Sequence, residues 1–275
     1  MALNFVSNFA ASVTQRHLKS SSAGLSLAIA RLSAGRRVLS ARDDAAAMAI
    51  GSRLGAEVAG LHQARSNAGQ GVSIAQVADG GMAGINDILV RMKTLAVQSG
   101  SGQLSNADRS AINTEFQALA SEVDRISADT EFAGTKLLDG STGSIAVRVG
   151  TGVDPNADDI SIALGTTTAT ALGINGTDVA TQAGADVASA AIGTAIDRIQ
   201  TLRASLGASQ NRLGFAAANI DISIENTEAA RSGLMDLDVA REMSNMTSKQ
   251  VLVNAGISML AQANQQTKHV LRLLA

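Results

Sequence analysis

The most regular pattern in the chain is a seven-residue repeat of hydrophobic positions over residues 238–275. Two positions of each repeat form a seam, which polar residues interrupt at Gln250, Asn264 and Thr267. The apolar members of this predicted seam are Val239, Met243, Met246, Val253, Ile257, Leu260, Leu271 and Leu274. A single helix cannot bury such a stripe, so the segment needs a partner helix.

The N-terminal region offers a partner for this repeat. Leu18, Leu25 and Leu32 are seven residues apart, and Ile29 follows Leu25 by four. We therefore predict that the two termini pair as a coiled coil and that copies of this coil stack into a polymer. Bundling without polymerisation is the alternative, and periodicity alone leaves it open.

The middle of the chain carries apolar stripes with steps of three and four residues, which is the period of a helix. One stripe covers residues 44–98 and would span ~80 Å, although Gly69 and Gly71 leave a bend or break open. Another covers residues 112–126, and a third runs from residue 186 toward the C-terminal repeat.

Two Ser-x-x-Asp motifs mark predicted helix starts, Ser40 with Asp43 and Ser105 with Asp108. Asp43 and Asp44 could also be read as a catalytic acid pair. Capping explains them more simply, because the helix dipole favours carboxylates in the first turn.

The period changes to two near residue 144. Apolar residues alternate with small or polar ones over 145–149 and again over 160–164, which predicts a β-hairpin over about 144–165. Residues 166–184 are rich in Thr, Gly and Ala and predict a loop. The predicted fold class is therefore mainly α: long antiparallel helices in a coiled-coil bundle, a small β-hairpin, and N- and C-termini paired as a terminal coiled coil.

Composition narrows the function classes. The net charge of −2 gives no basic balance for nucleic acid, and the absence of cysteine excludes disulfides and thiol nucleophiles. There is no apolar run long enough for a membrane span and no Sec-type signal peptide.

Sequence motifs of catalysis are not found. No histidine begins a zinc-protease motif, and phosphate loops and dinucleotide fingerprints are lacking. Asp154, Asn156 and Asp158 match the first ligands of a calcium loop, but Asp159 and Gly165 stand where that loop needs Gly and Glu. We therefore predict a chain that is not an enzyme, with no catalytic, cofactor-binding or metal-binding residues.

Several blocks of the sequence resemble the bacterial flagellins. They are RLSAGRRVLSARDDAAAMAI at 31–50, the helix over 67–98 ending in LAVQ, TEFAGTKLLDG at 130–140, LGASQNRL at 206–213 and QAN at 262–264. Five blocks in the right order make the resemblance strong, and it covers most of the chain. Departures are small: Ala47 stands where Gly is frequent, and Asp79 stands where Glu is common.

The resemblance implies a filament subunit for swimming motility, of a short form without outer variable domains. It implies export through the flagellar type III channel, so that the protein is secreted and located in the extracellular filament. It also implies an inner tube built by residues 1–42 and 235–275 and a core domain over 43–234. The partners implied are the protein itself, an export chaperone, and hook-associated and cap proteins. A flagellin-like hook–filament junction protein is the alternative.

Two further sets of residues follow from the resemblance. Arg91, Leu95 and Glu115 match the positions with which some flagellins contact a Toll-like innate receptor; the alternative for these residues is helix packing and surface solubility. Threonines of the predicted loop are candidates for O-linked sugars, as in some flagellins. They are Thr166, Thr167, Thr168, Thr170 and Thr177.

Overall fold

The computed structural model describes the backbone of residues 8–274 and the side chains of residues 8–266. Its elements in chain order are α1 Phe9–Ala34, α2 Ala45–Ser99, α3 Asn106–Asp129, β1 Glu131–Phe132, β2 Thr135–Lys136, β3 Ser144–Arg148, α4 Pro155–Asp158, β4 Asp159–Ala163, α5 Gln182–Met235 and α6 Val239–Leu274. The chain forms two compact units. We call Met1–Ala56 with Asn226–Ala275 the terminal unit and Glu57–Glu225 the core unit.

Besides a small apolar cluster of α2 and α5 residues, the core unit contains one large hydrophobic core. Apolar side chains of α2, α3 and α5 fill it, together with the β3–β4 hairpin and the loop that follows the hairpin. Phe116 is fully buried and is the largest side chain in the core. The predicted stripes are therefore the packing faces of these helices, and the long helix predicted over 44–98 is confirmed as an unbroken α2.

Polar contacts also join α2 to α5 in the core unit. Asp79 Oδ1 accepts a hydrogen bond from Arg203 Nε at 2.7 Å. Asn86 Oδ1 accepts another from Gln200 Nε2 at 3.1 Å. Gly71 lets the elements approach closely, because a Cβ at this position would lie 2.9 Å from Val147 Cγ2 and 3.1 Å from Leu213 Cδ1.

The predicted capping motifs have different outcomes. Ser105 and Asp108 form a complete capping box at the start of α3, and these hydrogen bonds from Ser105 lower the pKa of Asp108. The prediction that Ser40 and Asp43 begin a helix is wrong, because their hydrogen bonds close a turn instead. Asp44 Oδ1 caps α2 by accepting a hydrogen bond from Ala47 N–H at 2.9 Å.

Two antiparallel hairpins lie between α3 and α5. The predicted one is formed by β3 and β4, whose register pairs Ile145 with Ile162 and Val147 with Ile160. The other, β1–β2, was not predicted. Its turn has positive φ at both Ala133 (49°) and Gly134 (81°), which is the conformation of a type I′ turn.

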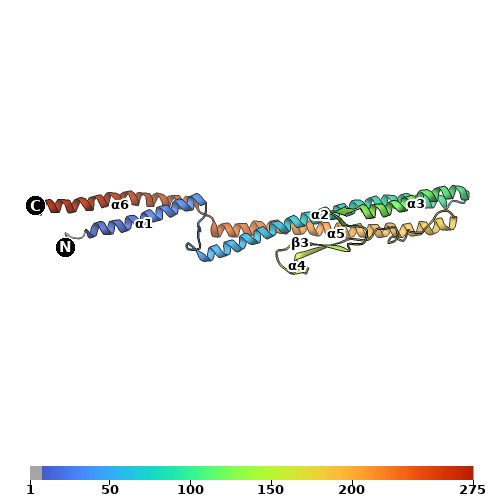
Figure 1. Cartoon of the computed structure of the whole chain (residues 1–275), viewed down its shortest axis with the longest axis horizontal. Helices are drawn as coiled ribbons and strands as arrows, with labels where there is room; N and C mark the ends of the chain where they lie inside the picture. The colour runs from blue at the N-terminus through green and yellow to red at the C-terminus, as the bar shows by residue number, and fades with distance from the viewer. Residues whose placement is uncertain (1–7, 275) are drawn as a thin grey trace. The chain divides into compact units, whose positions relative to one another are not determined.

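The terminal unit pairs α1 with α6, which lie side by side in Figure 1. Gly256 lies against Leu18, and Gly24 lies against the aliphatic part of Lys249. Asn8 Nδ2 donates a hydrogen bond to Ala263 O at 3.1 Å. The predicted pairing of the two terminal regions is therefore present within one chain.

A short backbone bridge closes the terminal unit where α1 and α5 end. Arg37 N–H donates to Met235 O at 2.8 Å, and Leu237 N–H donates to Gly35 O at 3.2 Å. Arg36 and Asp236 face each other in this antiparallel bridge. We call residues 35–37 and 235–237 the joint.

Candidate assembly surface

The contact between α1 and α6 is narrow and made mostly of small or partly polar residues. Along α6, the positions that are at least partly buried recur with steps of four and three. They are Glu242, Met246, Lys249, Val253, Gly256, Leu260 and Ala263. On α1 only Ala28 is fully buried. The heptad geometry of a coiled coil is therefore present, but it buries few large side chains.

One heptad position of the predicted seam lies in the contact between α1 and α6, and on α6 the other contact position is shifted by one residue from the prediction. The half-buried members of the predicted seam are Leu18, Leu25, Leu32, Met246, Val253 and Leu260. The predicted second position of α6, with Met243 and Ile257, is wrong as an intrachain contact because both side chains are exposed. Val239 and Ile29 are exposed as well. Leu271 and Leu274 lie outside the described side chains.

The shift has a physical cause. The apolar stripe of α6 is wider than the strip that one partner helix covers, and hydrophobic periodicity marks the centre of the stripe. The sequence therefore did not reveal that Glu242, Lys249 and Gly256 occupy the intrachain contact. One signal was available: Gly256 is the single glycine of the C-terminal repeat, and a glycine permits close approach of the facing helix.

The shift leaves large hydrophobic side chains exposed on both terminal helices. We call this set the outer apolar face. Its members are Phe9, Leu27 and Ile29 on α1, and Val239, Met243, Val251, Leu252, Ile257 and Met259 on α6. Ile257 is 55% exposed and Phe9 is 74% exposed. Exposed large hydrophobic side chains in this number are typical of helices that bind other protein surfaces.

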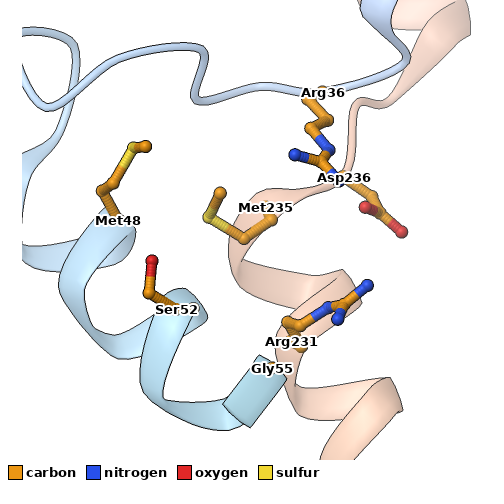
Figure 2. Close-up of a pocket in the computed structure, with 8 residues that line it drawn as sticks. Arg36, Met48, Ser52, Gly55, Arg231, Met235 and Asp236 are labelled. Carbon is orange, nitrogen blue, oxygen red and sulfur yellow. The ribbon is translucent and has the colours of Figure 1, made fainter. Parts of the chain in front are cut away.

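A small cavity lies beside the joint and is lined only by residues of the terminal unit. Its volume is about 200 Å³. Figure 2 shows Met48 and Ser52 on α2 facing Arg231 and Met235 on α5, with Arg36 above them. Gly51, Gly55 and Asp236 complete the lining. A Cβ on Gly51 would lie 2.7 Å from Met235 Sδ, so the Met235 side chain would have to shift to admit any other residue there.

The loop before α2 is held by an ionised aspartate. Desolvation acts to raise the pKa of Asp43, but hydrogen bonds from Leu39 N–H, the Ser40 hydroxyl and Ser40 N–H outweigh it, so the pKa is lowered overall. Asp43 therefore stays charged and keeps the turn closed at neutral pH.

Comparison with known proteins assigns the family. The profile described as "Bacterial flagellin N-terminal helical region" matches residues 5–142, and that described as "Bacterial flagellin C-terminal helical region" matches residues 189–274. This chain is a member of the bacterial flagellin family.

Relatives of this flagellin match it over most of their length. The "Flagellar filament 31.3 kDa core protein" of Treponema maltophilum is 38% identical over 89% of this chain and 90% of its own. "Flagellin FlaB2" of Treponema pallidum (strain Nichols) is 37% identical over 97% of this chain and 98% of its own.

A solved structure shares the fold of this flagellin. It is the putative flagellar hook-associated protein from Vibrio parahaemolyticus, with a TM-score of 0.59 and 16% identity. It covers 70% of this chain and 100% of its own. At this identity the likeness shows the fold alone.

The three residues matched to an innate-receptor contact have unequal access. Arg91 Nη2 and Glu115 Oε1 are 2.6 Å apart in an ion pair, and both side chains are about half exposed. Leu95 is only 2% exposed. The prediction that Leu95 belongs to a contact surface is therefore wrong, because its side chain packs in the core.

The candidate glycosylation sites also differ in access. Thr167 is fully buried, and its hydroxyl lies 3.3 Å from Ser127 Oγ, so the prediction fails at this residue. Thr166, Thr168 and Thr177 are half-buried, and Thr170 is exposed. Thr170 Oγ1 accepts a hydrogen bond from Asn175 Nδ2 at 3.0 Å.

The described part of the chain contains no group of three or more His, Cys, Asp or Glu side chains placed to hold a metal ion. The Asp154 side chain caps the short helix α4 by accepting a hydrogen bond from Asn156 N–H at 2.9 Å. Asp158 Oδ2 accepts one from Asp154 N–H at 3.0 Å. No helix among the described residues is long and apolar enough to cross a membrane.

Proposed function

We propose that this flagellin is a structural subunit that polymerises into the bacterial flagellar filament. The observation that carries the proposal is the match, over nearly the whole chain, to proteins named as flagellins and filament core proteins. The family is one of structural proteins, and we assign the chain no catalytic role.

The outer apolar face is the surface proposed for assembly. Its side chains lie on the same two helices whose narrow contact joins the chain ends, and they are not needed for that contact. Neighbouring copies would cover them, and contacts that repeat head to tail without closing generate an open helical polymer. The hydrophobic positions along α6 would then serve two partners: α1 of the same chain and helices of neighbouring chains.

The test is a pair of matched double variants on α6. Met243→Asp with Ile257→Asp places charges on the outer apolar face, where they must be desolvated when copies join. We expect a folded monomer with an unchanged circular dichroism spectrum and no filaments by negative-stain electron microscopy.

The control places the same charges at neighbouring exposed serines. Ser244→Asp with Ser258→Asp changes the net charge equally but removes no apolar side chain. This control is expected to form filaments. Normal filaments from the Met243→Asp, Ile257→Asp variant would contradict the proposed assembly surface.

The two parts of the chain would occupy different layers of the filament. Residues 1–42 and 235–275 would build the inner tube of the filament, and residues 43–234 would build the surrounding core domain. The subunit would be secreted through the flagellar export channel with the help of an export chaperone, and would contact hook-associated and cap proteins at the filament ends.

A hook–filament junction protein is the second candidate. The Vibrio parahaemolyticus structure supports only a shared fold, whereas the relatives that cover nearly the whole chain carry filament or flagellin names. Abundance separates the candidates: a filament subunit dominates a sheared filament preparation, and a junction protein is a trace component.

Recognition by a Toll-like receptor is a narrower proposal restricted to Arg91 and Glu115. Both are exposed and lie on one surface of α2 and α3. A reporter-cell assay comparing monomer with the Arg91→Ala variant tests it, and an unchanged response would contradict it. For O-glycosylation, Thr170 has the best access, and intact mass of the secreted protein tests it.

A further inference from the structure

The near-neutral total charge conceals a separation of charge between the two units. The core unit carries 18 acidic and 10 basic residues, a formal charge of −8. The terminal unit carries 12 basic and 6 acidic residues, a formal charge of +6. Opposite charges on separate units favour contact between the terminal unit of one copy and the core unit of another.

The cavity beside the joint is the place in the terminal unit best suited to such a contact. Among the described residues, the guanidinium groups of Arg36 and Arg231 form no ion pair or side-chain hydrogen bond, and both line the cavity together with the single carboxylate of Asp236. Met48 and Met235 give the same cavity an apolar side (Figure 2). Its chemistry therefore suits a small apolar side chain that stands next to a carboxylate.

The size of the cavity supports a side chain rather than a free ligand. Small-molecule sites usually have volumes of about 300–1,000 Å³, whereas this cavity has about 200 Å³. Methionine side chains adapt their shape to an incoming group, so the wall formed by Met48 and Met235 can close around one branched side chain.

The core unit presents such a pair of residues at the β3–β4 connection. Val153 is 89% exposed, more than any other large hydrophobic side chain described. Asp154 follows it directly, and one of its carboxylate oxygens caps α4. The connection is held in shape by Asp158, which accepts a hydrogen bond from Asp154 N–H. We call Val153 and Asp154 the hairpin tip.

We propose that the hairpin tip of one copy docks into the joint cavity of a second copy. Val153 would contact Met48 and Met235, and the Asp154 carboxylate would pair with Arg231 or Arg36. The inference rests on the proposed function, since it assigns a specific contact between subunits of the polymer. It explains why a valine is left in solvent in the β3–β4 connection.

The first experiment uses the absence of cysteine from the chain. Filaments are grown from an equal mixture of Ser52→Cys and Val153→Cys subunits and are then oxidised. Ser52 lines the cavity and is exposed. A disulfide requires Cα atoms within about 7 Å, so docking predicts a covalent dimer that links the 52 and 153 peptides in mass spectrometry.

The control mixes Val153→Cys with Ser121→Cys, an exposed residue of α3. Filaments that form with no more 52–153 product than the control product overturn the docking proposal and leave the proposed function intact. Failure of the unmodified protein to form filaments would instead overturn the proposed function, and the docking proposal with it.

A double-mutant cycle decides the question if the cysteine variants do not assemble. Arg231→Gln removes one charge of the cavity, and Asp154→Asn removes the tip charge but keeps the cap. We expect each variant to raise the critical concentration for polymerisation about tenfold, and the double variant to raise it no further. If the two effects are independent, the double variant raises the critical concentration about hundredfold, which would overturn the pairing. No change in the critical concentration for either single variant would overturn it as well.

Discussion

The core unit and the α1–α6 pair are both built from long helices, but they are stabilised differently. The core unit buries whole side chains such as Met82, Leu89 and Phe116 and adds an α2–α5 ion pair. The contact between α1 and α6 buries one alanine of α1 fully, and no ion pair among the described residues links these two helices. The core unit therefore has the burial needed to fold by itself, whereas the terminal pair leaves many of its large hydrophobic side chains exposed.

The largest expected loss of stability comes from truncating a side chain at the centre of the core. Phe116→Ala leaves a cavity where a fully buried ring stood, and such changes cost about 3–5 kcal/mol. We expect the free energy of unfolding of the core, from denaturant titration of the monomer, to fall by that amount. A loss under about 1 kcal/mol, typical of a surface position, would contradict the contrast between the units.

Alanine substitutions at two glycines of α2 are expected to change the stability of the core by intermediate amounts and in opposite directions. Gly71→Ala places a methyl group against Val147 and Leu213 and is expected to destabilise the core by about 1–3 kcal/mol. Gly69 has open space at the corresponding position, so Gly69→Ala is expected to stabilise the helix by up to about 1 kcal/mol. Thermal unfolding of both variants measures the difference, and equal shifts would contradict the close packing.

A truncation in α6 is expected to have little effect on the monomer. Val253 is half-buried against α1, and Val253→Ala removes limited packing while raising helix propensity, so the cost is expected below about 1 kcal/mol. Hydrogen exchange of α6 amides in the monomer measures it. Faster exchange that corresponds to a loss of stability as large as that of Phe116→Ala would show that α1 and α6 form a self-sufficient unit.

The smallest effect concerns the capping box of α3. Because the folded pKa of Asp108 is lowered from 3.8 by hydrogen bonds from Ser105, the charged form stabilises the fold above pH 3.8 and that contribution disappears as the pH falls through the lower, folded value. We expect Asp108→Asn to lower the melting temperature at pH 7, and the difference to shrink below pH 3.8. A difference independent of pH would contradict the electrostatic origin, and Ser105→Ala serves as the control.

Much of the fold follows from local patterns in the sequence. The steps of three and four predicted α2 and α5, and the alternation of period two predicted the β3–β4 pairing, because each pattern reports one buried face. The capping box at Ser105 was also predictable from residue type and spacing. The β1–β2 hairpin was missed since two-residue strands carry no periodicity and its turn uses Ala133 rather than a second glycine.

The candidate site was predictable only in part. Hydrophobic spacing identified the two terminal helices and Leu18 as members of a seam, but not which side of a wide apolar stripe faces α1. The burial of Leu95 and Thr167 contradicts the surface roles predicted for them. A sequence match gives a residue's position along the chain but not its access to solvent. The cavity beside the joint is lined by residues about 200 positions apart in the sequence, so no local sequence pattern predicts it.

The backbone bridge at the joint has a consequence for axial alignment. Small seam residues such as Ala28 and Gly256 would let α1 slide along α6 by one heptad with little loss of contact. The hydrogen bonds from Arg37 N–H to Met235 O and from Leu237 N–H to Gly35 O prevent this sliding, because they fix the residues after α1 next to the residues before α6. Every copy must then display its apolar side chains at the same height, which is the condition for regular stacking.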